Sequence, residues 1–368
     1  MGLTDAWGRL AVRHAHVLVA ELPGYWMTRV AVERQVLARG WRLARSPADA
    51  DILAVCGPPR PPLAQSLTRV WEQVPGPRTR VEVHSPRAVL AALDTAAADL
   101  LDTAAQRADG RDRTAEHGGT GRGGRRGGST PDAYGHAGHH EPPHGIPLAV
   151  GGEDRDGLEM DLLRLRLGPV LAYWPAGLVV GCALQGDVIV DAEASLVGVD
   201  DATTVAADAP VTDDPRRFAA RRCDNAVSLL GLAGWDDAAS RARRIRDALL
   251  FNSDPDRPAR ELDRLRRRVG RSWWLRWSLR RLGPLDGPEL ARRGLPATAV
   301  GDVRDRLLAI LDRAADSIAG RHPAGPPRRA PVEALPDLVR GWDVATARLI
   351  VASLDLEPLV TGREVSRV

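Results

Sequence analysis

The chain has 368 residues and is 44% hydrophobic, which is long and apolar enough for two domains that each bury a core. All 51 basic residues are arginine, and 48 acidic residues reduce the formal net charge to +3, so the composition does not indicate a nucleic-acid partner. Because lysine is absent, a Walker-type phosphate loop and Schiff-base catalysis are excluded. No run of about 18 apolar residues and no signal peptide is recognisable, and the sequence therefore predicts a cytoplasmic protein.

Residues 1–105 alternate between short apolar runs and longer segments with helical spacing. The apolar runs predict three strands, each followed by a predicted helix, in the order 16–22, 27–40, 50–59, 62–74, 78–85 and 86–101. Strands that alternate with helices are typical of a parallel sheet. The sequence therefore predicts a small α/β domain.

Residues 106–146 are rich in Gly, Arg and His and offer almost nothing to bury, which predicts a disordered linker. Two sharper interpretations remain open for this segment. The run GRGGRRGG at 121–128 is typical of an RNA-binding segment. Alternatively, four histidines could bind a divalent metal ion: His136, His139, His140 and His144.

Residues 147–368 predict an α+β domain that begins with a β-hairpin and continues as a helical bundle. The hairpin turns at Gly186-Asp187, and the first helical stretch is broken near 231–234. Asp302 is placed to cap a helix that ends at Gly320. A single last helix is predicted from its apolar stripe, which is Leu338, Trp342, Ala345, Leu349 and Ala352.

Three tryptophans, Trp273, Trp274 and Trp277, stand among arginines in the run RSWWLRWSLRR. This pattern favours an interface with the first domain or with another subunit, and the arginines would extend along its rim. A basic aromatic helix can also lie on a membrane surface or stack on nucleic acid.

The three cysteines, Cys56, Cys182 and Cys223, are far apart in the sequence and form no C-x-x-C motif. We therefore expect neither a disulfide framework nor a zinc or iron-sulfur site made from neighbouring thiols. Three buried core thiols are the expected outcome.

Several segments of the second domain carry a family resemblance. They read GPVLAYWPAG at 168–177, GDVIV at 186–190, LVG at 196–198, GDVRDRLLAILDRAADSI at 301–318 and LPDLVRGWDVATARLIVASLDLEPLVTGREVSR at 335–367. In this order they resemble the quinone-proximal large subunit (D type) of the NADH:quinone oxidoreductase (complex I) and NiFe-hydrogenase superfamily. The family has histidines in the first of these motifs, and this chain has none there.

The first domain is similar to the small iron-sulfur subunit (B type) of the same superfamily, through residues 46–83. The adjacent cysteine pair of that family would fall near Glu21-Leu22-Pro23-Gly24, which contains no thiol. A cubane cluster needs thiolate ligands, so the resemblance implies that the cluster is lost and that the chain has no cofactor.

The resemblance also implies that the hairpin once faced a quinone headgroup. The remnants of that cavity would be Tyr173, Trp174, Asp224 and Asn225, with the family's quinone-binding tyrosine falling close to Asn225. No catalytic residue is expected.

As a whole, the resemblance implies a degenerate fusion of the two subunit types that acts as an accessory or assembly component of an oxidoreductase complex. Its partners would be other subunits of that complex, which could hold it peripherally at the inner face of the cell membrane. In this family the two subunit types pack directly on each other. The alternatives are an active, divergent NADH:quinone oxidoreductase subunit with a relined quinone cavity and, from a different class, an RNA-binding module.

Overall fold

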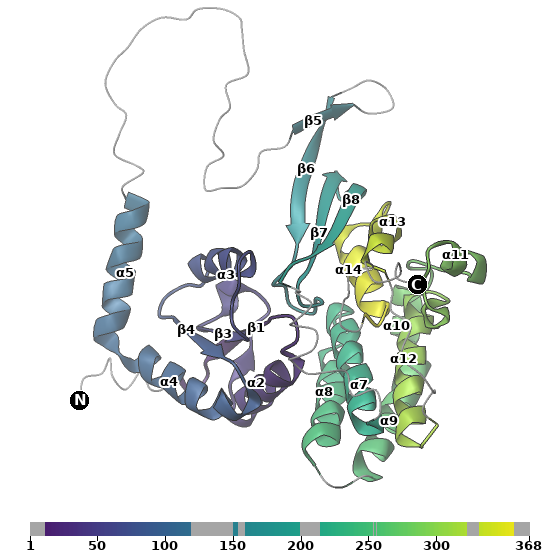
Figure 1. Ribbon diagram of the computed structural model, residues 1–368, viewed down its shortest axis with the longest axis horizontal. Helices are drawn as coiled ribbons and strands as arrows, with labels where there is room; N and C mark the ends of the chain where they lie inside the picture. The colour runs from purple at the N-terminus through teal and green to yellow at the C-terminus, as the bar shows by residue number, and fades with distance from the viewer. Residues whose placement is uncertain are drawn as a thin grey trace, which may run out of the picture.

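The computed structural model describes residues 12–118, 150–153, 159–198, 214–252, 254, 256–321 and 331–356. A parallel sheet with helices on both faces is followed by an antiparallel sheet and a group of helices, and the two parts lie side by side (Figure 1). The predicted fold class, an α/β domain followed by an α+β domain, is confirmed.

The first domain contains a four-stranded parallel sheet in the order β2-β1-β3-β4. The strands are β1 (His16–Glu21), β2 (Arg42–Leu43), β3 (Ile52–Cys56) and β4 (Thr79–Val83). The helices are α2 (Trp26–Ala38), α3 (Leu63–Glu72), α4 (Val89–Leu101) and α5 (Thr103–Gly118). The three predicted strands are confirmed. The edge strand β2 was not predicted, because two residues are too few to form a recognisable apolar pattern.

Alternation along the strands divides the core of this domain into two layers. Val17 and Ile52 face α2 and α4, whereas their neighbours Leu18 and Leu53 face α3. Both sides of β1 and β3 are therefore covered, which explains why these strands read as continuous apolar runs.

Helix α5 occupies the first part of the segment that was predicted to be a disordered linker. It continues to Gly118, whereas the sequence predicted disorder from residue 106. Its first two turns are tied to the rest of the first domain, because Gln106 accepts from the backbone N–H of Arg78 at 2.9 Å and the Arg78 guanidinium donates to Asp109 at 3.0 Å. Polar anchoring replaces the apolar face that the sequence lacks. Residues 119–146, which include the Arg-Gly run and the four histidines, lie outside the described residues.

The second domain starts with a four-stranded antiparallel sheet in the order β5-β6-β7-β8. Its strands are β5 (Val150–Glu153), β6 (Glu159–Leu167), β7 (Leu178–Gln185) and β8 (Val188–Leu196). The predicted hairpin is β7 and β8, and it turns at Gly186-Asp187 as expected. Gly186 has a φ of +63°, a value that glycine adopts without steric cost.

The helices of this domain are α7 (Pro215–Leu232), α8 (Asp236–Phe251), α9 (Asp256–Arg271), α10 (Trp273–Leu279), α11 (Gly287–Arg292), α12 (Val303–Ile318), α13 (Leu335–Val339) and α14 (Val344–Ser353). The break between α7 and α8 lies where it was predicted. Asp302 caps α12 and exchanges hydrogen bonds with Asp305 in a capping box.

The predicted single last helix was wrong. It is divided into α13 and α14, because the backbone of Gly341 and Trp342 pairs with Ile189 of β8 and Asp343 then caps a new helix at Thr346. The new register buries Ala347, Ile350 and Val351, whereas Ala345 of the predicted stripe is exposed.

The two domains contribute to each other's cores. Trp26 and Val30 of α2 belong to the core of the second domain, while Val170 and Val197, which follow β6 and β8, pack against the α3 side of the first domain. Part of each core is therefore completed by the other domain.

Over the described ranges, no helix combines the length and the apolar character that crossing a membrane requires.

Candidate functional site

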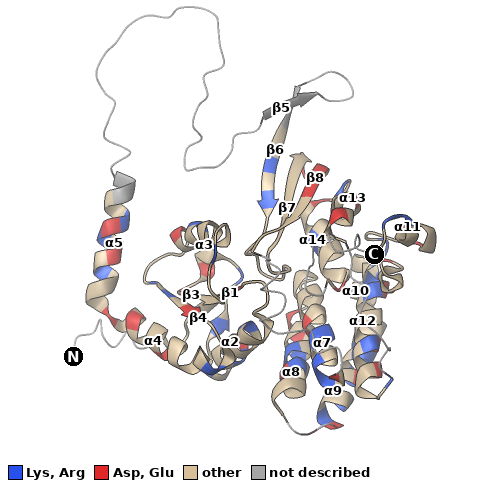
Figure 2. Cartoon of the chain, viewed as in Figure 1, with Lys and Arg blue, Asp and Glu red and all other residues tan. Residues whose placement is uncertain are grey.

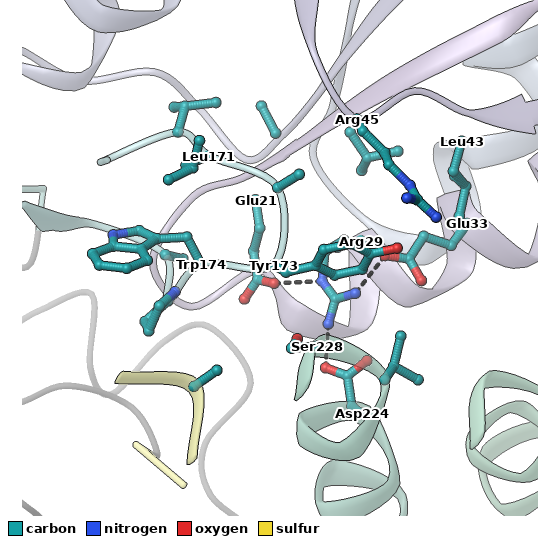
Figure 3. A pocket seen from close by; sticks show the side chains of 18 of the residues that line it. Glu21, Arg29, Glu33, Leu43, Arg45, Leu171, Tyr173, Trp174, Asp224 and Ser228 are labelled. Atoms are coloured by element: carbon teal, nitrogen blue, oxygen red, sulfur yellow. Dashed lines mark hydrogen bonds and ion pairs between the residues drawn. The ribbon is translucent and has the colours of Figure 1, made fainter. Parts of the chain in front are cut away.

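The first domain brings three charged side chains to its border with the second domain. Glu21 ends β1, and Arg29 and Glu33 follow on α2 at a spacing of four, which places them on one helix face. Arg29 donates to Glu21 and to Glu33, so both carboxylates hold the same guanidinium (Figure 3).

The second domain meets this group with Asp224 of α7 and Arg246 of α8. Arg246 is completely buried, and its Nη1 donates to Asp224 Oδ1 at 2.7 Å and to Glu33 Oε2 at 2.8 Å. Arg29 donates to Asp224 from the opposite side, and the indole N–H of Trp26 donates to Asp224 at 2.9 Å. We call Arg29, Glu33, Asp224 and Arg246 the interdomain ion network.

The charges of this network fix the protonation of its carboxylates. Burial alone would raise the pKa of Glu33, but Arg29 and Arg246 outweigh burial and lower this pKa to about 2. Burial opposes ionisation of Asp224 as well, and the same two arginines hold its pKa far below the ordinary range. Both groups are therefore ionised at neutral pH.

The loop between β6 and β7 adds aromatic side chains to the same border. Tyr173 has a φ of +58°, which is uncommon outside glycine, and its ring lies against Gly231 of α7. A Cβ added to Gly231 would lie 2.6 Å from Tyr173 Cζ, so only glycine leaves room for this ring. Trp174 is fixed by its own indole N–H, which donates to the carbonyl of Leu178 at 2.8 Å.

These elements enclose a cavity of about 150 Å³ between the two domains. All four residues predicted for a remnant quinone cavity line it, namely Tyr173, Trp174, Asp224 and Asn225, although they come from a loop and a helix about 50 positions apart. Arg29, Glu33 and Arg45 form its polar side, and Leu171, Val227 and Val351 part of its apolar side. A cavity of this size can accommodate a single aromatic ring.

Asn225 also belongs to a second buried group. Its amide donates to Asp355, which accepts from Arg313 at 2.8 Å and lies 3.3 Å from Arg222 Nε. Burial would raise the pKa of Asp355, and the two arginines lower it instead. Asp355 follows α14, so this group ties the end of the described chain to α7 beside the cavity.

The segment at which the B-type family would carry its cysteine pair lies at the cavity. Glu21 lines it, and Pro23 packs against the β6–β7 loop so closely that a Cβ on Gly177 would lie 2.7 Å from Pro23 Cγ. Cys56 is paired in register with Glu21 on the neighbouring strand, and it is the one thiol at this sheet edge. One thiol and one carboxylate do not match the four thiolates of a cubane cluster, so the residues present do not fit that group.

All three thiols are buried, as predicted. Burial raises the pKa of Cys182 to about 11 and that of Cys223 to about 12, and it raises the pKa of Cys56 further. Within the described part of the chain, no group of three or more His, Cys, Asp or Glu side chains could hold a metal ion.

The three tryptophans predicted as an interface lie on α10, on the side of the molecule away from the first domain (Figure 1). The exposed fractions of Trp273, Trp274 and Trp277 are 63%, 63% and 74%. The first domain therefore does not cover them, and they are not part of the core.

Of the interdomain ion network, only Asp224 was identified from the sequence, through the resemblance. The spacing of Arg29 and Glu33 is compatible with an ion pair on one helix face, but α8 and α9 carry Arg–carboxylate pairs at the same spacing, so this signal does not single out the network. That Arg246 crosses to Glu33, 213 positions away, depends on the docking of the domains and leaves no local signal.

What the site can do chemically is limited by these contacts. Its carboxylates are ionised and held by arginines, its thiols are protonated and enclosed, and its remaining volume is bordered by two aromatic rings. Such an arrangement can bind a small planar molecule or join two domains.

Comparison with models of known protein families and with curated proteins found no match to this chain.

Proposed function

We propose that the chain is a fused, non-catalytic relative of the B-type and D-type subunits and that it serves as an accessory or assembly component of an oxidoreductase complex. The observation that supports this most is the saturation of the two buried carboxylates. Both oxygens of Glu33 accept from arginines, and both oxygens of Asp224 accept from arginines or from the Trp26 indole.

A carboxylate in this state is a poor catalyst. A general acid or base works best when its pKa is near the operating pH and one of its oxygens can reach the substrate. Glu33 and Asp224 meet neither condition, because their pKa values are lowered and their oxygens are occupied. Their contacts instead join α2 to α7 and α8, which is a structural role.

The proposed partners are the other subunits of a redox complex. Direct packing of B-type and D-type subunits is a property of the resembled family, and the two domains of this chain pack directly on each other through shared cores. Fusion raises the effective concentration of one domain for the other, so the pair would enter an assembly as one preformed unit.

The test is to tag the chain in its native host, purify it gently and identify the chains that accompany it. We expect subunits of an oxidoreductase in constant proportion. Deletion of the gene should reduce the amount of assembled complex while the turnover of each remaining complex is unchanged. A chain that purifies alone would contradict the proposal, as would a complex that assembles normally without the chain but loses its turnover.

A second candidate, quinone binding, is supported by the cavity itself. Tyr173 and Trp174 border a volume suited to one ring, and apolar quinones bind in aromatic-lined pockets without a histidine. Titration of the purified chain with a short-chain benzoquinone should then give saturable binding. Ser228→Leu, which would fill the cavity from α7, should abolish it, while Thr68→Leu on the exposed side of α3 should not. Equal or absent binding in all three chains would exclude this candidate.

A further inference from the structure

Helix α9 carries a basic stripe. Four arginines repeat at intervals of four, three and four along one exposed face, namely Arg260, Arg264, Arg267 and Arg271. The opposite face is apolar and buried, through Pro258, Leu262, Leu265 and Val269. The stripe extends over about 16 Å of helix. Figure 2 shows the blue of arginine recurring along the helices of this domain.

Within the described ranges, these four guanidiniums differ from their neighbours in lacking a carboxylate partner. Arg266 pairs with Asp312, and Arg268 pairs with Asp237 at 2.8 Å. Among the residues that the structure describes, no carboxylate lies within ion-pair distance of any of the four stripe arginines. Three of them, with Arg268, Trp235 and Ser272, line a surface groove of about 520 Å³. Unpaired cations along a groove favour an anionic ligand.

The charge continues into α10. Residues 264–285 contain eight arginines and neither Asp nor Glu, whereas the whole chain carries a net charge of only +3. The rest of the chain is therefore net acidic, and the positive charge is concentrated on this segment. A surface with this asymmetry attracts an extended anionic surface and repels a second copy of itself.

The stripe leads directly to the three exposed tryptophans. Ser272 caps α10, and Leu275 and Leu279 anchor this helix in the core, so Trp273, Trp274 and Trp277 are left on its outer side. Indole rings that border a basic surface are typical of proteins that lie in the headgroup region of a bilayer. A cluster of exposed apolar side chains of this size generally marks a binding site.

The arrangement of the rings argues against nucleic acid. Trp273 and Trp274 are stacked on each other with centroids 4.3 Å apart, and Trp277 meets Trp274 edge-on at 6.5 Å. No base can enter between rings this close, because a base needs stacking distance on both of its faces. The rings form one apolar cluster instead of a series of separate stacking platforms.

We propose that α9 and α10 form a binding surface for an anionic lipid bilayer, with the tryptophan cluster among the headgroups and the stripe arginines on lipid phosphates. This inference does not rest on the proposed accessory function, since it concerns the purified chain and lipid alone. Binding would be peripheral and would weaken as salt is added.

The test is flotation of the purified full chain with vesicles of phosphatidylcholine and phosphatidylglycerol in equal parts, compared with vesicles of phosphatidylcholine alone. We expect the chain to float with the anionic vesicles and to remain below with the neutral ones. Arg264→Gln/Arg267→Gln/Arg271→Gln should weaken partitioning by roughly tenfold or more. A matched variant, Arg69→Gln/Arg87→Gln/Arg111→Gln, removes the same charge from exposed sites of the first domain and should bind as the wild type does.

A second variant, Trp273→Ser/Trp274→Ser/Trp277→Ser, should also lose binding while its thermal unfolding is unchanged, since these rings are exposed. Three results would overturn the proposal: no flotation with anionic vesicles, equal loss in the control and stripe variants, or no vesicle binding combined with stripe-dependent binding of a single-stranded RNA oligonucleotide. A tryptophan variant that unfolds would leave the arginine variant to decide the matter.

Discussion

The indole N–H of Trp26 donates to a carboxylate oxygen of Asp224, 198 positions further along the chain, at a donor–acceptor distance of 2.9 Å. Trp26 is the first residue of α2, and Asp224 lies near the middle of α7, so this hydrogen bond joins the two domains. Arg29 and Arg246 hold the same carboxylate from two further directions. A single side chain of the second domain thus receives donors from both domains.

Asp224 should therefore be the most sensitive position of the interface. Asp224→Ala leaves Arg29 and Arg246 with fewer partners in a buried site, and removing one member of a buried ion pair costs about 3–5 kcal/mol. Urea unfolding should show a loss of this order. Asp236→Ala removes a carboxylate that is paired with Arg45 but well exposed, and its cost should stay within about 1 kcal/mol. Equal effects of the two changes would show that the network adds no stability.

The interface should open at acid pH. The pKa of Glu33 is lowered to about 2 in the folded chain from an ordinary value of 4.5. The stabilisation is thus complete above pH 4.5 and is lost as the pH falls from there towards 2. This difference corresponds to roughly 3 kcal/mol at neutral pH. In Glu33→Gln, the free energy of unfolding measured by urea should be lower at pH 7 and should fall less between pH 5 and 3 than in the wild type. An identical slope would contradict the assignment.

Gly231 should tolerate no side chain. In Gly231→Ala the new methyl group would meet the ring of Tyr173 and force the β6–β7 loop away from α7, a change that typically costs about 1–3 kcal/mol. Gly110→Ala is the matched control, because no atom lies within 4 Å of its added Cβ on α5. The control should leave stability unchanged or raise it by about 0.5–1 kcal/mol. Thermal unfolding of both variants distinguishes them, and a harmless Gly231→Ala would show that the ring moves freely.

The thiols should be unreactive and free of iron. Burial encloses Cys56, Cys182 and Cys223 and raises their pKa values, so little thiolate forms at neutral pH. A thiol reagent such as dithionitrobenzoate should label none of them until the chain is unfolded, and all three in denaturant. Protein purified without oxygen should be colourless. Rapid labelling of the native chain, or stoichiometric iron and sulfide, would refute this account of the cysteines.

The strands and helices that carry apolar patterns were predictable, and those that depend on polar contacts were not. Apolar runs and helical spacing located β1, β3 and β4 with their helices, and the cap at Asp302 located the start of α12. Helix α5 escaped prediction because polar contacts to Arg78 anchor it. The division between α13 and α14 depends on backbone pairing with Ile189, which no local pattern encodes.

The site was predictable only in part, and this part came from the family resemblance and not from apolar patterns. Tyr173, Trp174, Asp224 and Asn225 were chosen by resemblance, and all four line one cavity. Glu33 and Arg246 were not chosen, because their roles exist only once the domains have docked. Physical patterns in one segment specify what that segment buries, whereas a cross-domain ion pair is specified by two segments together.

The distance between these partners along the chain also sets an order of events during synthesis. Glu33 leaves the ribosome 213 residues ahead of Arg246, which corresponds to roughly ten to forty seconds of translation. Throughout that interval the nascent first domain presents Trp26, Val30 and an incompletely neutralised acidic group on a face that awaits its cover. The first domain must therefore remain folded and unaggregated with this face open, and α7 and α8 close it only when most of the protein has been made.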